Sequence, residues 1–262
     1  MIDFSHEDRQ PGVEVRSRRP AAGRGEPESI RGWAERGTLL ALLQFPDGLF
    51  PAGGFAHSFG LETYAQAGRV RDRKELEAFL VAHLEGSVGP CDAVAAALAA
   101  RSAGAASLAP WLEIDGRLDA MKCVPEFRAA SRQMGRQTVR VAAALGSDTM
   151  LGALGAVVDD GGTPGHHAMV FGAVTGRAGV AAEDVAAAFL YSTSMLLVSA
   201  GLRLLPLGQL DGQRTLAAVR PLIVRLAARA GRAELDDMWS FAPGLEGAGL
   251  AHANLEMRLF RS

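Results

Sequence analysis

The chain has 262 residues, a formal net charge of −2 and a pI near 6.3, with 48% hydrophobic and 21% charged residues. This balance is typical of a soluble globular protein with one large domain, and it gives no global field that would favour nucleic acid or an anionic membrane as a partner. The two cysteines, Cys91 and Cys123, show no C-x-x-C spacing. They therefore indicate neither a zinc site nor a disulfide framework, and we expect a reducing, cytoplasmic setting.

The N-terminal residues are rich in Arg, Pro, Gly and Glu and lack the apolar segment of a secretion signal. We expect a disordered N-terminal tail over residues 1–36. A helical domain is expected over residues 37–242, followed by a separate C-terminal segment over residues 243–262. That last segment is apolar for a chain end, because Leu255, Leu259 and Phe260 lie close together in it. Such a cluster packs either on its own domain or in the groove of a partner.

Residues 47–62 have the sequence DGLFPAGGFAHSFGLE, in which a Pro- and Gly-rich loop leads into an apolar helix. We call them the opening segment. Glycine allows positive φ and close backbone approach, and Pro51 fixes its own φ, so the path of the backbone is expected to matter here. The side chains of His57, Ser58 and Glu62 suggest catalysis, but adjacent helical residues point about 100° apart and no oxyanion motif accompanies them. A structural or interface role is favoured, with a helical metal-dependent hydrolase using His57 and Glu62 as the alternative.

From Thr38 onward apolar residues recur at spacings of three and four, and strict alternation is scarce. This pattern predicts an all-α fold, a single globular domain of about ten helices. Gly86 to Pro90 is expected to end one helix before the next begins at Asp92. The uncharged stretch over residues 185–202 is long enough to span a membrane, but its Ser, Thr and Tyr content favours a buried central helix.

The predicted helix from Pro125 to Leu145 carries arginines at every fourth position, at Arg128, Arg132, Arg136 and Arg140. Such spacing places them in one stripe along the helix. A solvated helix face is the commoner use of such a stripe, and an acidic partner or phosphate is the other. The sequence alone leaves both open.

His166 and His167 are a second candidate for metal binding, because imidazole is a common ligand for ions such as Ni²⁺ and Zn²⁺. Adjacent residues of a helix diverge, however, and the i, i+4 spacing of a helical metal site is absent. One buried and one exposed histidine is the expected arrangement, with a hydrolase using His166 and His167 as the alternative. The chain also lacks the G-x-x-x-x-G-K-[ST] motif of nucleotide hydrolases, so any link to GTP is expected to come through a partner.

The opening segment resembles the N-terminal signature of the UreF family of urease accessory proteins. A second segment, SAGLRLLPLGQ over residues 199–209, is similar to that family's Ser-Ala-x-x-Arg-Leu-x-Pro-Leu-Gly-Gln segment. The closing residues 258–262, RLFRS, are similar to a further family pattern. The three occur in the same order as in the family, so the resemblance runs from about Leu39 to the end of the chain.

The resemblance implies an all-α, dimer-forming accessory protein that is a scaffold and regulator, not an enzyme. It implies that the protein bridges UreD, also called UreH, and the GTPase UreG for GTP-dependent nickel insertion into apo-urease, and that it regulates the GTPase activity of UreG. No cofactor is expected on this chain itself, since Ni²⁺ and GTP are handled by the complex. Partner contacts are expected at the shape-critical loops and at the C-terminal segment, which is expected to dock UreD. The residues concerned are Asp47, Pro51, Gly53, Gly54, His57, Ser58, Gly60, Glu62, Arg203, Pro206, Gly208, Gln209, Leu255, Arg258, Leu259 and Phe260.

Overall fold

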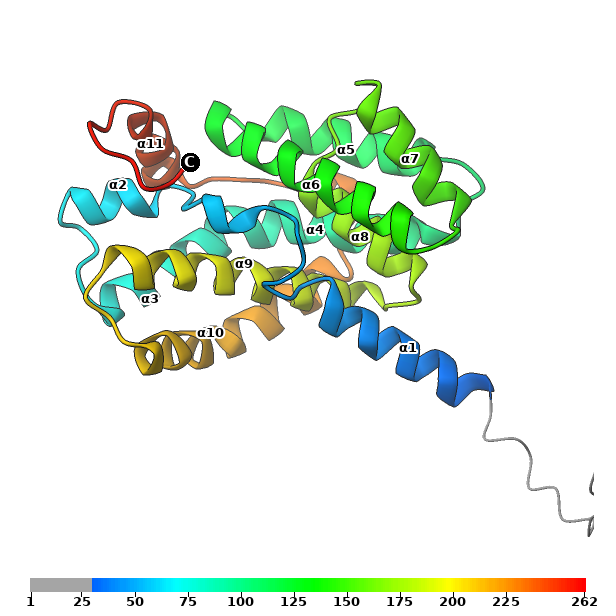
Figure 1. The fold of residues 1–262 in the computed structure, drawn as a ribbon, viewed down its shortest axis with the longest axis horizontal. Helices are drawn as coiled ribbons and strands as arrows, with labels where there is room; N and C mark the ends of the chain where they lie inside the picture. The colour runs from blue at the N-terminus through cyan, green and yellow to red at the C-terminus, as the bar shows by residue number, and fades with distance from the viewer. Residues whose placement is uncertain (1–29) are drawn as a thin grey trace, which may run out of the picture.

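A computed structural model describes residues 30–262, and every regular element in that range is a helix, which confirms the all-α prediction (Figure 1). The α-helices are α1 (Ile30–Gln44), α2 (Leu61–Gln66), α3 (Arg73–His83), α4 (Val94–Arg101), α5 (Ala109–Met121), α6 (Pro125–Leu145), α7 (Thr149–Asp159), α8 (His167–Arg177), α9 (Ala182–Leu204), α10 (Gln209–Ala230) and α11 (Pro243–His252). Short 3₁₀ helices are η1 (Gly54–Ala56), η3 (Ser102–Gly104) and η4 (Leu235–Asp237). Most of the expected tail lies outside the described residues, but α1 already begins at Ile30, within the expected range of that tail.

Helix α4 lies at the centre of the fold, between α8 and α9 (Figure 1). All its residues from Val94 to Ala100 are buried, as expected of an Ala-rich helix that is apolar on every side. Two glycines of α8 allow a close approach to it. A Cβ added at Gly172 would lie 2.1 Å from the Ala96 carbonyl oxygen, and one at Gly176 would lie 2.6 Å from the Cα of Ala100. Any larger residue at these two positions would push α4 and α8 apart.

Helix α9 is long and apolar enough to cross a membrane by length and composition, and it is the one such helix within residues 30–262. Half of its most apolar window is buried inside the fold, and the helix packs against α4, α8 and α10. This is the position expected for a central helix, where an apolar surface contacts neighbouring helices.

The expected helix end at residues 86–90 is wrong. The chain continues from α3 into α4 through a π-helical segment, η2 (Leu84–Ala93), that contains Pro90. Two carbonyl groups of this segment bind elsewhere, since Gly86 O accepts from Phe241 N at 2.8 Å and Pro90 O accepts from Trp239 N at 3.2 Å. The wider π turn accommodates the proline, and the residues after η4 satisfy the backbone groups that it leaves free.

The C-terminal segment (residues 243–262) packs on the same helical body. Helix α11 contacts α2 and α6, and Leu245 and Phe260 are buried in the common core. The expected boundary at residue 242 therefore does not separate two packed bodies. Helix α1 differs, because it extends away from the other helices over most of its length (Figure 1).

Candidate functional site

The opening segment and the C-terminal segment meet, although about 200 residues separate them in the sequence; we call this contact the junction. The carbonyl oxygen of Ser262 accepts hydrogen bonds from Ser58 N at 2.6 Å, Phe59 N at 3.0 Å and Ser58 Oγ at 2.8 Å. Arg261 N donates to Ala56 O at 2.9 Å. These bonds fix Arg261 and Ser262 against the opening segment.

Glycine and strained backbone shape the opening segment as the sequence predicts. Gly53 and Gly60 have φ of 85° and 88°, in the left-handed region that residues with a Cβ avoid. Gly54 packs on α9, where an added Cβ would lie 2.6 Å from Leu196 Cδ1. Phe59 has φ of 47°, the one positive value outside glycine within residues 30–262. Holding a bulky residue there costs about 1–3 kcal/mol, which the bonds to Ser262 help to offset.

Glu62 is the centre of the junction. Its carboxylate is 1% exposed and accepts from Leu259 N at 2.6 Å and from Phe260 N at 3.1 Å. It also contacts His252 Nε2 at 3.0 Å, while the other nitrogen of that ring, Nδ1, lies 2.7 Å from the Glu126 carboxylate. The junction therefore joins two carboxylates from different helices, Glu62 of α2 and Glu126 of α6, through one buried imidazole.

Arg203 links α9 to the junction. Its guanidinium carbon lies 3.8 Å from the centre of the Phe55 ring and 4.1 Å from that of Phe260, so that it stacks between the opening segment and the C-terminal segment. Nη2 also donates to Phe55 O at 2.9 Å. Burial lowers the pKa of Arg203 below its ordinary value. Partner contacts are expected from the sequence at each of these segments, and three of their residues, Arg203, Phe55 and Phe260, lie in direct contact.

Some of the expected partner-binding residues are buried inside the junction. Four of them are each less than 5% exposed: His57, Ser58, Glu62 and Phe260. Their side chains fix the shape of the surface from beneath but do not reach it to contact a partner. The His57 Nδ1 atom lies 2.9 Å from Ser262 Oγ, and burial, reinforced by Arg261, lowers the pKa of His57 to about 4.

Other expected residues lie at the surface. Asp47, Pro51 and Gly53 are exposed in the opening segment, where Asp47 Oδ1 accepts from Leu49 N at 2.8 Å. Pro206, Gly208 and Gln209 are exposed in the turn that begins α10. In the C-terminal segment Leu255 is half-buried, whereas Arg258 is exposed and donates to Glu126 at 2.9 Å.

Three large apolar side chains stand exposed around the junction. Phe55 is 68% exposed, Met257 is 81% exposed and Leu259 is 61% exposed. We call them the junction rim. Of the three, only Leu259 is expected from the sequence to contact a partner. The exposure of Phe55 and Met257 depends on how the opening segment and the C-terminal segment cross. Side chains of this kind on a fixed backbone are typical of protein–protein contacts.

The histidines proposed for a hydrolase lie apart and are already engaged. His166 Nδ1 lies 3.0 Å from Ser131 Oγ, and its Nε2 lies 2.8 Å from Asp119 Oδ1. The ring of His167 packs against Phe171 and Phe189, and burial lowers its pKa to about 4. Among the described side chains, those of residues 37–262, no group of three or more His, Cys, Asp or Glu is arranged to hold a metal ion. The rings of His166 and His167 contact different groups, a serine and an aspartate for the first and two phenylalanines for the second.

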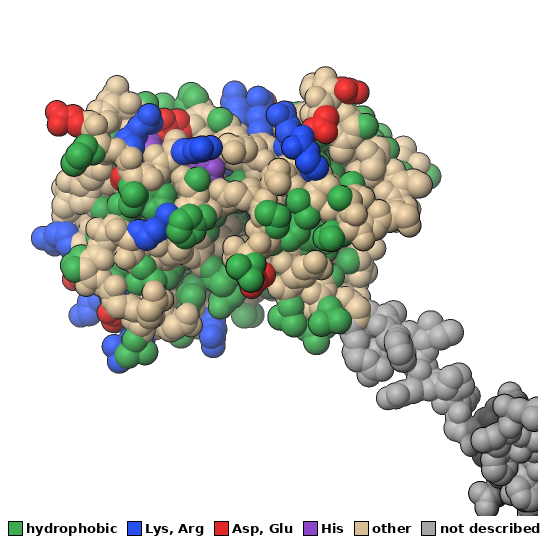
Figure 2. Space-filling view, viewed as in Figure 1, with side chains coloured by type: hydrophobic (Ala, Val, Ile, Leu, Met, Phe, Trp, Pro, Cys, Tyr) green, Lys and Arg blue, Asp and Glu red, His purple; other side chains and the backbone are tan. Residues whose placement is uncertain are grey.

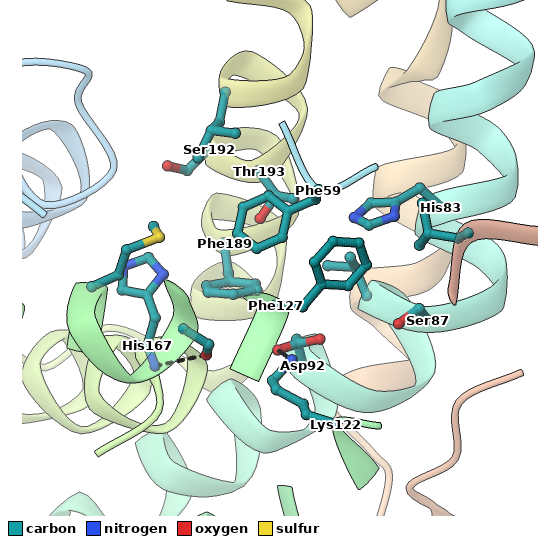
Figure 3. A pocket seen from close by; sticks show the side chains of 15 residues that line it. Phe59, His83, Ser87, Asp92, Lys122, Phe127, His167, Phe189, Ser192 and Thr193 are labelled. Atoms are coloured by element: carbon teal, nitrogen blue, oxygen red, sulfur yellow. Dashed lines mark hydrogen bonds and ion pairs between the residues drawn. The ribbon is translucent and has the colours of Figure 1, made fainter. Parts of the chain in front are cut away.

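A cavity of about 80 Å³ that the sequence did not reveal lies beside the junction, walled by Phe59, Phe127 and Phe189 (Figure 3). An ion pair lies at one end, with Lys122 Nζ 2.7 Å from Asp92 Oδ1. Burial acts to lower the pKa of Lys122, but Asp92 and Cys91 together outweigh it and raise the pKa above its ordinary value, so the ammonium group stays charged. The one available signal was that Lys122 is one of only two lysines in the chain.

His83 lines the same cavity. Its ring stacks on Phe79, and its Nδ1 atom is the one buried side-chain nitrogen or oxygen without a hydrogen-bond partner within residues 30–262. Burial lowers the pKa of His83 to about 4, so the ring is neutral at pH 7. The cavity thus combines neutral imidazoles with one internal ion pair.

Comparison with known proteins agrees with the resemblance seen in the sequence. The UreF family model matches residues 70–220. The chain is 36% identical over 224 residues to the urease accessory protein UreF of Rhodopseudomonas palustris (strain BisA53), covering 86% of this chain and 93% of that protein. It is 30% identical to the urease accessory protein UreF of Bacillus sp. (strain TB-90), covering 86% of this chain and 99% of that protein. The chain belongs to the UreF family.

Proposed function

We propose that this chain acts in urease maturation as a scaffold that joins UreD to the GTPase UreG and presents both to apo-urease. In this role it carries no catalytic group of its own. Ni²⁺ is the ion that the assembled complex delivers, and GTP is the substrate of UreG within that complex. Family membership supports the role in urease maturation. The identity of the partners and the regulation of UreG follow from the resemblance in sequence.

The observation that carries the proposal is the junction rim. Phe55, Met257 and Leu259 are exposed, yet the backbone beneath them is held by the buried carboxylate of Glu62 and by Arg203. A rigid apolar surface loses little conformational entropy on binding, so it suits a stable partner contact. We assign this rim to UreD.

A second exposed apolar surface supports the proposed homodimer. On α1, Leu39, Leu40 and Leu43 are 56%, 64% and 62% exposed, and this helix extends away from the body of the fold (Figure 1). Burying such a strip against a second copy would remove apolar surface from water. Light scattering of the isolated chain measures the mass directly, and a monomer at all concentrations would exclude this dimer.

The test of the UreD contact is co-expression with UreD and UreG, followed by size-exclusion chromatography with and without GTP and Ni²⁺. We expect the wild-type chain to co-elute with both proteins, and Leu259→Asp to reduce co-elution of UreD about tenfold or more. Val224→Asp on α10 is the matched control, because Val224 is 65% exposed and lies away from the junction. Full recovery of UreD with the Leu259→Asp chain would show that the rim is not the docking site.

A further inference from the structure

Helix α6 carries a row of four arginines that the proposed function leaves unused. Arg128, Arg132, Arg136 and Arg140 follow one another at every fourth residue and are between 37% and 60% exposed. Two carboxylates face them, and each is shared. Asp119 lies 2.5 Å from Arg132 and 3.8 Å from Arg128, while Asp159 lies 3.3 Å from Arg140 and 4.0 Å from Arg136. Four guanidinium groups against two carboxylates leave an excess of two positive charges along this arginine row.

The N-terminal half of the arginine row, Arg128 and Arg132, is held in place by hydrogen bonds. Asp119 accepts from both Nε and Nη2 of Arg132, and it also contacts the buried His166 ring at 2.8 Å. Burial acts to raise the pKa of Asp119, but the bonds from His166 and Arg132 outweigh it and keep the pKa below its ordinary value. Arg128 Nε donates to the Lys122 carbonyl at 2.8 Å. Both guanidinium groups are therefore oriented before any partner arrives, which lowers the entropy cost of binding.

The C-terminal half of the row, Arg136 and Arg140, is held more weakly and can exchange one carboxylate partner for another. Arg136 and Arg140 share Asp159, which is itself 51% exposed, and exposed ion pairs of this kind contribute little to stability. A carboxylate from another protein can replace Asp159 with little loss. The row thus combines a fixed end with an adaptable end.

High arginine content alone does not explain the row. Helix α10 also carries four arginines, Arg214, Arg220, Arg225 and Arg229, at spacings of six, five and four residues. At about 100° per residue these spacings turn Arg220 away from the other three. Arg225 on α10 pairs with Glu85, and Arg214 lies 3.7 Å from Asp211. On α6 each arginine is turned only about 40° from the one before it, so all four form a continuous row.

We propose that the arginine row of α6 is a docking surface for an acidic protein face whose carboxylates are spaced about 6 Å apart, as on one side of a helix. This rests on the proposed scaffold function and names the chemistry of one partner contact. Asp119 and Asp159 within the row, together with the negative net charge of the chain, favour separate carboxylates over a continuous phosphate backbone.

The row is also continuous with the junction. Its N-terminal end adjoins Glu126, which binds Arg258 and His252 of the C-terminal segment. Figure 2 shows Lys and Arg side chains gathered along the upper part of the face on which α6 and the C-terminal segment lie. An acidic partner on the row would therefore sit beside a partner bound at the junction rim.

The test compares the full-length wild-type chain with the charge-reversed double variant Arg136→Glu/Arg140→Glu. Binding to immobilised UreD, UreG and apo-urease is measured separately in about 50 mM and about 300 mM NaCl. For one of the three proteins we expect the variant to raise Kd about tenfold or more at low salt, and the wild-type Kd to rise about fivefold or more at high salt. Arg220→Glu/Arg229→Glu on α10 is the matched control and is expected to change Kd less than about twofold.

The outcomes separate this inference from the function on which it rests. If the wild-type chain binds none of the three proteins, the scaffold function fails and the docking surface fails with it. If the wild type binds but the α6 variant binds all three equally well, the docking surface alone is wrong. Saturable binding of a DNA duplex that the α6 variant abolishes would assign the row to phosphate instead. Thermal melting of each variant confirms that the fold is intact.

Discussion

His252 and His166 are both fully buried and both contact carboxylates, but they differ in their second partner. His252 lies between two carboxylates, those of Glu62 and Glu126. His166 lies between Asp119 and the Ser131 hydroxyl, which can donate to its other nitrogen. Burial lowers the pKa of His166, consistent with a neutral ring. His252 therefore joins two carboxylates, whereas His166 joins a carboxylate to a hydroxyl.

The strongest test of this difference is Glu62→Gln. The variant keeps the size of the side chain but turns an amide donor toward Leu259 N or Phe260 N, and it removes one of the two carboxylates that contact His252. Removing one partner from a buried, hydrogen-bonded polar network of this kind costs about 3–5 kcal/mol of unfolding free energy. Denaturant unfolding monitored by circular dichroism measures this loss. Asp236→Asn is the control, because that carboxylate is 95% exposed and its loss is expected to cost less than about 0.5 kcal/mol.

The two histidines can also be compared directly. His252→Gln leaves two buried carboxylates without the imidazole that bonds to both, and we expect a loss of about 2–4 kcal/mol of unfolding free energy. His166→Gln removes a ring bonded to one carboxylate and one hydroxyl, and we expect a loss of about 1–2 kcal/mol. Equal losses, or a larger one for His166→Gln, would contradict the idea that the second carboxylate makes His252 the more important of the two rings for stability.

Sequence predicted the helices well because their signals are local. The Pro125–Leu145 helix begins at a proline and carries its arginines at regular spacing, and the structure gives it the same bounds. The wrong helix end at residues 86–90 has a distant cause. The carbonyl groups of Gly86 and Pro90 accept hydrogen bonds from the backbone N–H groups of Phe241 and Trp239, which lie about 150 residues further along the chain.

The junction was predictable in its parts and not in its assembly. Family resemblance singled out the opening segment, Arg203 and Phe260, yet no local pattern pairs Glu62 with His252, which is 190 residues away. The cavity was even harder to predict from the sequence. Asp92, the partner of Lys122, lies in η2, the segment that continues the helix beyond the end predicted at residues 86–90. Long-range polar contacts of this kind follow from the fold and carry no periodicity of their own.

The smallest effect is expected at His83, which lines the cavity. Its ring is buried and, unlike the rings of His252 and His166, is not bonded to a carboxylate. Burial lowers its pKa from 6.5 to about 4, so between these values the unfolded chain binds a proton that the folded chain does not. Stability from this group is thus fully present above pH 6.5 and is lost as the pH falls toward 4. His83→Phe keeps the aromatic stack on Phe79 and removes the titration, and we expect it to reduce the slope of unfolding free energy against pH by about 1 kcal/mol per pH unit in this window. Only the slope is compared, so any change in packing that the substitution causes at pH 7.5 does not affect the result. An unchanged slope would show that burial does not lower the pKa of His83 in the folded chain.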